Sequence, residues 1–151
     1  MDNYGITMKG AFTLNSGLAD GTYSGVADPG TAGETLAFGN MCYKKPADSR
    51  WWLAKADVTA TSGICDVGFC VLAGNASDPI LILTGEGNIR ANSVFDTFTV
   101  GKPIFISAAD SGKVTDTAPS GTTGYVVRCV GRAETADSIR VKISPDYLEL
   151  R

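Results

Sequence analysis

The sequence contains no histidine. Because histidine is the commonest general base, proton shuttle and metal ligand in proteins, its absence excludes Ser-His and Cys-His nucleophilic catalysis. The chain also lacks a G-x-S-x-G nucleophile elbow and a G-x-x-x-x-G-K-[ST] phosphate loop, and Gly85-Glu86-Gly87 lacks the third glycine of a dinucleotide-binding loop. We therefore expect that the protein is not an enzyme and has no catalytic residues and no cofactor.

Carboxylates are the remaining candidates for acid and base chemistry, because paired Asp and Glu side chains act together in glycosidases. The available residues are Asp57, Asp66, Asp78, Glu86 and Asp96. Each lies in or beside an expected turn, where carboxylates commonly cap backbone groups. A small-ligand barrel or a carbohydrate-active enzyme therefore stays open as an alternative, besides the two structural functions considered below.

The chain has little positive charge and no long apolar run. It carries 13 Lys and Arg against 16 Asp and Glu, for a net charge of −3. Contact with a phosphate backbone requires clustered cations, so we expect no nucleic-acid partner. The apolar run at residues 80–83 is far shorter than the roughly 20 residues that span a bilayer, and the N-terminus lacks a signal-peptide core. We expect no membrane partner and synthesis in a cytoplasm.

The four cysteines are too few for a disulfide scaffold in a chain of 151 residues. They are Cys42, Cys65, Cys70 and Cys129. None forms a CxxC pair, and no histidine could complete a zinc site, so we expect no metal. Free cysteine is among the most buried residue types, which predicts small buried thiols.

The residues that are present favour β-structure. Val, Ile, Thr, Phe and Tyr recur in short runs, and 18 Gly and 6 Pro separate these runs. Strands are expected at residues 36–44, 50–54, 67–73, 79–84 and 104–107. The run 79–84 is apolar on both faces, which predicts a central or interface strand. We expect hairpins with loops at residues 44–49 and at Asp110-Ser111-Gly112, and turns this frequent indicate a small antiparallel β-barrel or sandwich.

Two further features concern local structure. One helical turn is expected at residues 57–63, capped by Asp57 and ended by Gly63, and Gly85-Glu86-Gly87 is expected to break a strand. Near the C-terminus, alternation predicts a half-buried antiparallel pair. One strand of this pair carries Tyr125, Val127 and Cys129 on one face, and the other carries Ile139, Val141 and Ile143.

The N-terminal region is expected to be separate from the domain. Residues 1–33 are expected to form an extended N-terminal arm and loop, with glycine and proline making residues 22–33 a loop. The arm has apolar residues spaced roughly by two, namely Tyr4, Ile6, Met8, Phe12 and Leu14. Residues 34–151 are expected to form the β-domain.

Trp51-Trp52 is the most conspicuous dipeptide, because neighbouring strand positions point to opposite faces and only one indole can enter a given core. The second indole could lie on a half-exposed sheet surface. It could also contact a protein partner, or it could stack on a sugar. These three interpretations remain open.

Several segments together resemble a known group of proteins over residues 35–150. The first half contains LAFGNMCY at 36–43, RWWLAKAD at 50–57 and VGFCV at 67–71, and the second half contains FTVGKPIFIS at 98–107, GYVVRCVG at 124–131 and SIRVKISP at 138–145. The pattern is similar to that of bacteriophage structural domains found in capsid decoration and head-fibre proteins and in tail-associated fibres. The loop at residues 44–49 and the arm have no counterpart in it.

The resemblance implies a β-barrel or β-tulip-like domain that is usually a homotrimer and binds the outside of the assembled capsid, stabilising the shell. The implied partners are the major capsid protein and further copies of the chain, and the implied location is the virion surface, after assembly in the host cytoplasm. In this hypothesis the arm docks onto the shell. In the alternative, the protein is a tail or head fibre module that binds a host receptor or glycan through Trp51 or Trp52.

Overall fold

The computed structural model describes residues 17–151 and shows an all-β domain, which confirms the expected fold class. The elements are β1 (Thr22–Thr31), β2 (Met41–Lys44), β3 (Trp51–Leu53), the 3-10 turn η1 (Thr59–Thr61), β4 (Val67–Leu72), β5 (Pro79–Arg90), β6 (Pro103–Ile106), β7 (Val114–Thr115), β8 (Val126–Val127), β9 (Cys129–Thr135), β10 (Ser138–Val141) and β11 (Leu148–Glu149). No helix in this part of the chain is long and apolar enough to cross a membrane.

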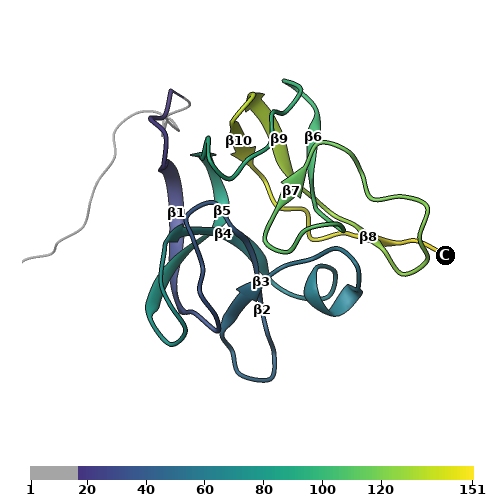
Figure 1. Ribbon diagram of the computed structural model, residues 1–151, viewed down its shortest axis with the longest axis horizontal. Helices are drawn as coiled ribbons and strands as arrows, with labels where there is room; N and C mark the ends of the chain where they lie inside the picture. The colour runs from purple at the N-terminus through teal and green to yellow at the C-terminus, as the bar shows by residue number, and fades with distance from the viewer. Residues whose placement is uncertain (1–16) are drawn as a thin grey trace, which may run out of the picture.

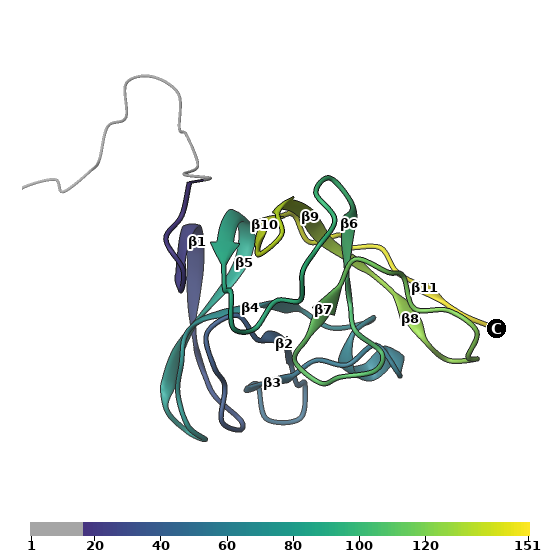
Figure 2. The same ribbon diagram turned by 45° about the horizontal axis from the view of Figure 1, so that its top comes forward.

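Nine strands form one sheet in the order β3-β2-β4-β5-β10-β9-β6-β7, and β1 pairs with β5 outside this path. All strand pairings in this sheet are antiparallel, and the sheet curls into about half of a barrel (Figure 1). Strands β8 and β11 form a separate two-stranded ribbon. In Figure 2 this ribbon extends from the sheet and ends at the C-terminus.

Strand β5 organises the sheet because it is paired along both edges. Strand β1 follows it along one edge, while β4 and then β10 pair with successive halves of the other edge. The expected break at Gly85-Glu86-Gly87 is therefore wrong, since β5 runs through it. Gly87 lies so close to β1 that an added Cβ would meet the carbonyl oxygen of Ser24. Glycine permits this backbone approach, and the expectation that residues 79–84 form a central strand is confirmed.

The expected loop at residues 22–33 is also wrong, because most of it is the ten-residue strand β1. Strand β1 tolerates Gly25 and Pro29 because it lies beside a single strand, and its register with β5 shifts between Gly25 and Ala27. The segment before it is attached as well: Leu18 is buried, and its carbonyl oxygen accepts a hydrogen bond of 3.0 Å from Arg90 Nη1. Within the described residues, the expected arm is thus part of the domain.

The curled sheet has apolar packing on both faces of β2, β4 and β5, which explains their nearly continuous apolar sequences. The first core includes Met41, Phe69, Leu83, Ile89, Ile104, Ile106, Val126, Val130, Ile139 and Val141. The second core is smaller and comprises Ala32, Leu36, Cys42, Trp51, Cys70, Ile80 and Ile82. Neighbouring residues such as Phe69 and Cys70 therefore belong to different cores.

The C-terminal strands pair as expected, but in the segment before β10 the buried residues are not the ones that were predicted to share a face. Strands β9 and β10 are antiparallel, and Ile139 and Val141 are fully buried as expected. The preceding segment, however, buries Val126 and Val130 completely, whereas Tyr125, Val127 and Cys129 are only half-buried. The register of β9 with β6 then shifts between Cys129 and Gly131. This bulge resets the alternation, so the faces cannot be extrapolated along the sequence.

The shorter elements agree with most expectations. Strands β6 and β7 pair around the predicted Asp110-Ser111-Gly112 hairpin. The helical turn is present as η1, where the amide of Gly63 donates a 2.8 Å hydrogen bond to the carbonyl of Thr59. Its N-cap is Val58 rather than Asp57, whose carboxylate instead lies 3.2 Å from Lys55 Nζ.

Candidate interaction surface

Trp51 and Trp52 occupy different environments, as strand alternation predicts. The Trp51 side chain belongs to the second core and is only 5% exposed. It lies against β1 so tightly that a Cβ on Gly30 would be 2.6 Å from its Cδ1. Trp51 is consequently a packing residue and offers no surface to a partner.

The Trp52 indole is half-buried and makes contacts within its own chain. Its Nε1 donates a hydrogen bond of 3.2 Å to Asp48 Oδ2, and Lys45 Nζ lies over the ring at 4.7 Å from the centroid. A Cβ on Gly33 would also collide with the indole. These neighbours occupy much of the aromatic surface on which a sugar would stack, so the structure does not favour Trp52 as a glycan platform.

The expected arm contacts Tyr4, Ile6, Met8, Phe12 and Leu14 lie outside the described residues. The described chain begins at Gly17. The carboxylate of Asp20 accepts a 2.8 Å hydrogen bond from the amide of Asn92, next to the attachment of Leu18 to Arg90. Gly17 lines a hollow with Arg132 and Arg140 on the outer face of β9 and β10. The described part of the chain therefore begins beside these two arginines.

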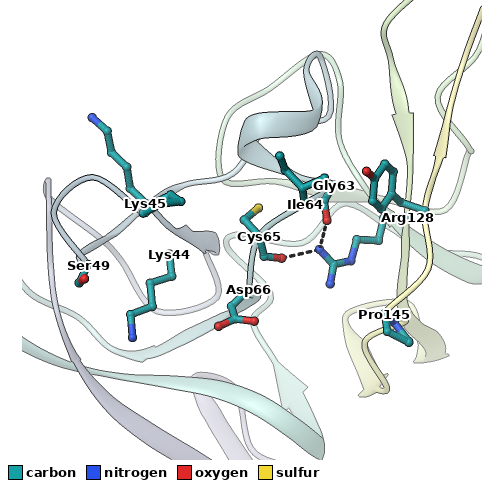
Figure 3. A pocket seen from close by; sticks show the side chains of 11 residues that line it. Lys44, Lys45, Ser49, Gly63, Ile64, Cys65, Asp66, Arg128 and Pro145 are labelled. Atoms are coloured by element: carbon teal, nitrogen blue, oxygen red, sulfur yellow. Dashed lines mark hydrogen bonds between the residues drawn. The ribbon is translucent and has the colours of Figure 1, made fainter.

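A second groove has Arg128 in its wall (Figure 3). Its lining includes Lys44, Lys45, Ser49, Gly63, Ile64, Cys65, Asp66, Arg128, Pro145 and Tyr147. Arg128 lies between Val126 and Val130 on the buried side of its segment and is 6% exposed. A charged group on an apolar face must be hydrogen-bonded to remain there.

Arg128 meets this requirement by joining two loops. Its Nη1 donates to the carbonyl oxygens of Ser62, Gly63 and Cys65 at 3.1, 2.9 and 2.7 Å. Its Nε donates to the carbonyl oxygen of Ser144 at 2.9 Å. The guanidinium thereby ties the turn after η1 to the segment that leads into β11.

Two groups of the groove, Cys65 and Arg128, have shifted pKa values. Burial raises the pKa of the Cys65 thiol, and although Arg128 opposes this shift, the thiol is protonated near neutral pH. Burial lowers the pKa of Arg128, and nearby Cys65 and Asp66 oppose that shift. Because Nε and Nη1 of Arg128 bind backbone carbonyls, these donors are not free for a ligand. Whether the protein lacks enzymatic activity remains a prediction.

The groove also presents apolar side chains to solvent. Ile64 is 69% exposed and Tyr147 is 39% exposed, and both line the groove with Pro145. We call Ile64, Pro145 and Tyr147 the apolar rim. The ring of Tyr147 lies against Gly63, where an added Cβ would be 3.0 Å from Cε2. Since Gly63 is one of the residues bound by Arg128, the buried arginine holds the rim in place.

The four cysteines are free thiols, as expected. Cys42 and Cys70 are fully buried in the second core, and Cys65 and Cys129 are half-buried. Burial raises the pKa of Cys42 well above its usual value and raises that of Cys70 to about 11. Among residues 17–151, no group of three or more Cys, Asp or Glu could hold a metal ion.

Sequence reasoning selected the tryptophans and missed the apolar rim. The available signal was Arg128 itself, which occupies an inward position between two valines in the segment GYVVRCVG. An arginine at that position predicts a buried polar anchor. Its partner Cys65, however, is more than 60 residues away in the sequence, so the sequence does not indicate which loop the arginine holds. The chain matches no family model, no curated protein and no solved structure.

Proposed function

We propose that this protein is a structural component of a bacteriophage particle that binds the outside of the assembled capsid and stabilises the shell. The structural observation that supports this proposal best is the apolar rim, whose exposed Ile64 and Tyr147 belong to two segments that Arg128 joins. The resemblance of residues 35–150 to capsid decoration and head-fibre domains suggests the kind of assembly in which the rim would make contacts.

A rigid exposed apolar surface suits contact between proteins. Aromatic and apolar side chains form the centres of protein interfaces, and a side chain that is already ordered loses less entropy when it binds. The hydrogen bonds of Arg128 to Gly63 and Cys65 supply this order before any partner arrives. We assign the apolar rim to contacts between copies of the chain in a homotrimer.

A trimer would explain how a small domain binds a shell tightly. Three copies that engage symmetry-related sites together raise the effective concentration for each contact, so weak contacts combine into strong attachment. The N-terminal segment with Tyr4, Ile6, Met8, Phe12 and Leu14 is the proposed shell-binding arm. Major capsid protein is the proposed partner.

The structure sets where this arm can be removed. Leu18 and Asp20 are attached to the domain through Arg90 and Asn92, so a deletion must stop before them. We propose to delete residues 1–16 and to compare the shortened and full-length proteins in cosedimentation with empty shells of the same phage. The full-length protein should bind and cosediment, and the deletion should remain folded and monodisperse but lose binding.

The outcome separates the parts of the proposal. Absence of full-length protein from the shell pellet, under conditions in which the shells are intact, would contradict the decoration function. Equal binding of the two proteins would contradict the assignment of the arm. Binding to a host glycan that is lost in Trp52→Ala, without shell binding, would favour the fibre alternative.

A further inference from the structure

Two arginines face each other on the outer surface of the sheet. Arg132 of β9 and Arg140 of β10 are directly paired across the two strands, and both are exposed. Directly opposed residues have Cβ atoms about 5 Å apart, and like charges at such positions destabilise a sheet. Lys142 follows Arg140 two positions later, and its side chain is 78% exposed. We call Arg132, Arg140 and Lys142 the basic ridge.

The basic ridge separates two hollows of the surface. One hollow also contains Glu86 and Lys142, and the other contains Gly17 and Glu134. Arg132 and Arg140 line both of them. A polypeptide segment that crossed the ridge would therefore meet both guanidinium groups and could place side chains on either side.

The positive charge of the ridge is only partly compensated within the chain. Arg140 pairs with Glu134, and Lys142 Nζ lies 3.7 Å from Glu86 Oε1. Arg132 Nη1 donates a 2.9 Å hydrogen bond to the carbonyl oxygen of Gly101, and among residues 17–151 no carboxylate lies within ion-pair distance of Arg132. Both side chains of the Lys142–Glu86 pair are exposed, so this pair contributes little and exchanges readily, whereas the half-buried Glu134 keeps part of the charge of Arg140 compensated.

We propose that the basic ridge is a docking surface for an acidic segment of a partner polypeptide. Guanidinium groups bind carboxylates with two parallel hydrogen bonds, which gives both orientation and strength. The guanidinium groups of Arg132 and Arg140 lie on the same face of the sheet at directly paired positions. This arrangement suits an extended chain in which every second residue carries a carboxylate. The unfavourable pairing of Arg132 with Arg140 would be relieved by these carboxylates.

This inference rests on the proposed function for the identity of the partner, which would be a shell subunit. The place where the described chain begins supports the link. Gly17 lines one hollow of the ridge, so a segment that continues from Gly17 toward the N-terminus starts beside Arg132 and Arg140. The described chain thus begins on the same side of the domain as the basic ridge.

A protein partner fits the ridge better than a nucleic acid. A phosphate backbone is bound by extended clusters of cations, whereas here Glu86 and Glu134 are interspersed with three cations in a chain of net charge −3. Carboxylates of a folded or extended polypeptide require fewer and better-placed charges. The acidic peptide is thus the occupant to test first.

The test uses the full-length protein labelled with ¹⁵N and a synthetic peptide of alternating Glu and Ser. We expect the peptide to shift the amide resonances of β9 and β10 selectively, and a Gln-Ser peptide to leave them unchanged. Arg132→Gln combined with Arg140→Gln should weaken binding about tenfold or more. The matched control is Lys113→Gln combined with Arg151→Gln, which removes the same charge from exposed positions elsewhere and should change affinity less than about twofold.

Three results would overturn the inference: shifts spread over the whole surface, equal weakening by both double variants, or tighter binding of a single-stranded oligonucleotide than of the acidic peptide. Failure of the proposed function is distinguishable from these. If wild-type protein ignores shells but the peptide binds selectively at β9 and β10, the decoration function fails and the docking surface stands. If shells bind wild type and both double variants equally, and the peptide does not bind, the docking surface fails and the decoration function stands.

Discussion

Arg128 Nη1 lies 2.7 Å from the carbonyl oxygen of Cys65, so a buried charge holds a loop 63 residues away in the sequence. The same guanidinium reaches Ser144 through Nε. One side chain thus joins its own segment both to the turn after η1 and to the segment that leads into β11. The position of the apolar rim depends on this contact.

Replacing Arg128 should therefore destabilise the domain strongly. Arg128→Met keeps most of the side-chain volume but leaves the carbonyl groups of Ser62, Gly63 and Cys65 without this donor, and we expect a loss of about 3 kcal/mol in the free energy of unfolding. Urea denaturation measures the change. Arg132→Met is the matched control on an exposed site and should cost less than about 1 kcal/mol. Similar losses in the two variants would contradict the anchoring role of Arg128.

A methyl group at Gly30 should disturb the second core. Its Cβ would lie 2.6 Å from Trp51 Cδ1, so Gly30→Ala must displace the indole, at a cost of roughly 1–3 kcal/mol. At Gly85 the nearest atom to an added Cβ is 3.8 Å away, so Gly85→Ala should be nearly neutral. Thermal unfolding followed by tryptophan fluorescence compares the two. Equal melting temperatures would show that Trp51 is not packed against β1.

The buried thiol of Cys70 should make stability fall at alkaline pH. Burial raises its pKa from 9.0 to about 11, so the folded protein keeps this proton to a higher pH than the unfolded chain does. The stabilisation is fully present below pH 9 and is lost as the pH rises from about 9 to about 11. One thiol contributes a slope of about −1.4 kcal/mol per pH unit in that window.

Denaturation of variants across that pH range isolates this contribution. The slope of Cys70→Ala should be shallower than that of wild type by about this amount, whatever its stability at neutral pH. Ile82→Val, which removes buried volume from the same core but no ionisable group, is the control and should keep the wild-type slope. A wild-type slope in Cys70→Ala would show that other groups cause the alkaline loss.

Ile64→Ser should weaken self-association without unfolding the domain. The side chain is 69% exposed, so its replacement should change the free energy of unfolding by less than about 0.5 kcal/mol. If the apolar rim joins copies of the chain, sedimentation equilibrium should show a trimer for wild type and a shift toward monomer for Ile64→Ser. Val26→Ser changes a residue that is 67% exposed elsewhere and should remain trimeric. A wild-type monomer at all concentrations would contradict the assignment of the rim.

Much of the local structure could be predicted because it depends on neighbouring residues. The hairpin at Asp110-Ser111-Gly112, the turn before Gly63 and the inward face of Ile139 and Val141 all follow from turn chemistry or alternation. The errors occurred where glycine and proline were interpreted as breaks. Gly87 instead allows the close approach of β1, and Pro29 is accommodated in a strand with a single neighbour.

The sequence by itself determined that this is a β-protein without histidine chemistry, with two indoles in different environments, because composition and strand alternation are local properties. Only the tertiary structure decided which residues form surfaces. The bulge between Cys129 and Gly131 turns Arg128 inward and Arg132 outward, although the two are an even number of residues apart. One arginine became an internal anchor and the other part of an exposed ridge because strand register is set by long-range pairing.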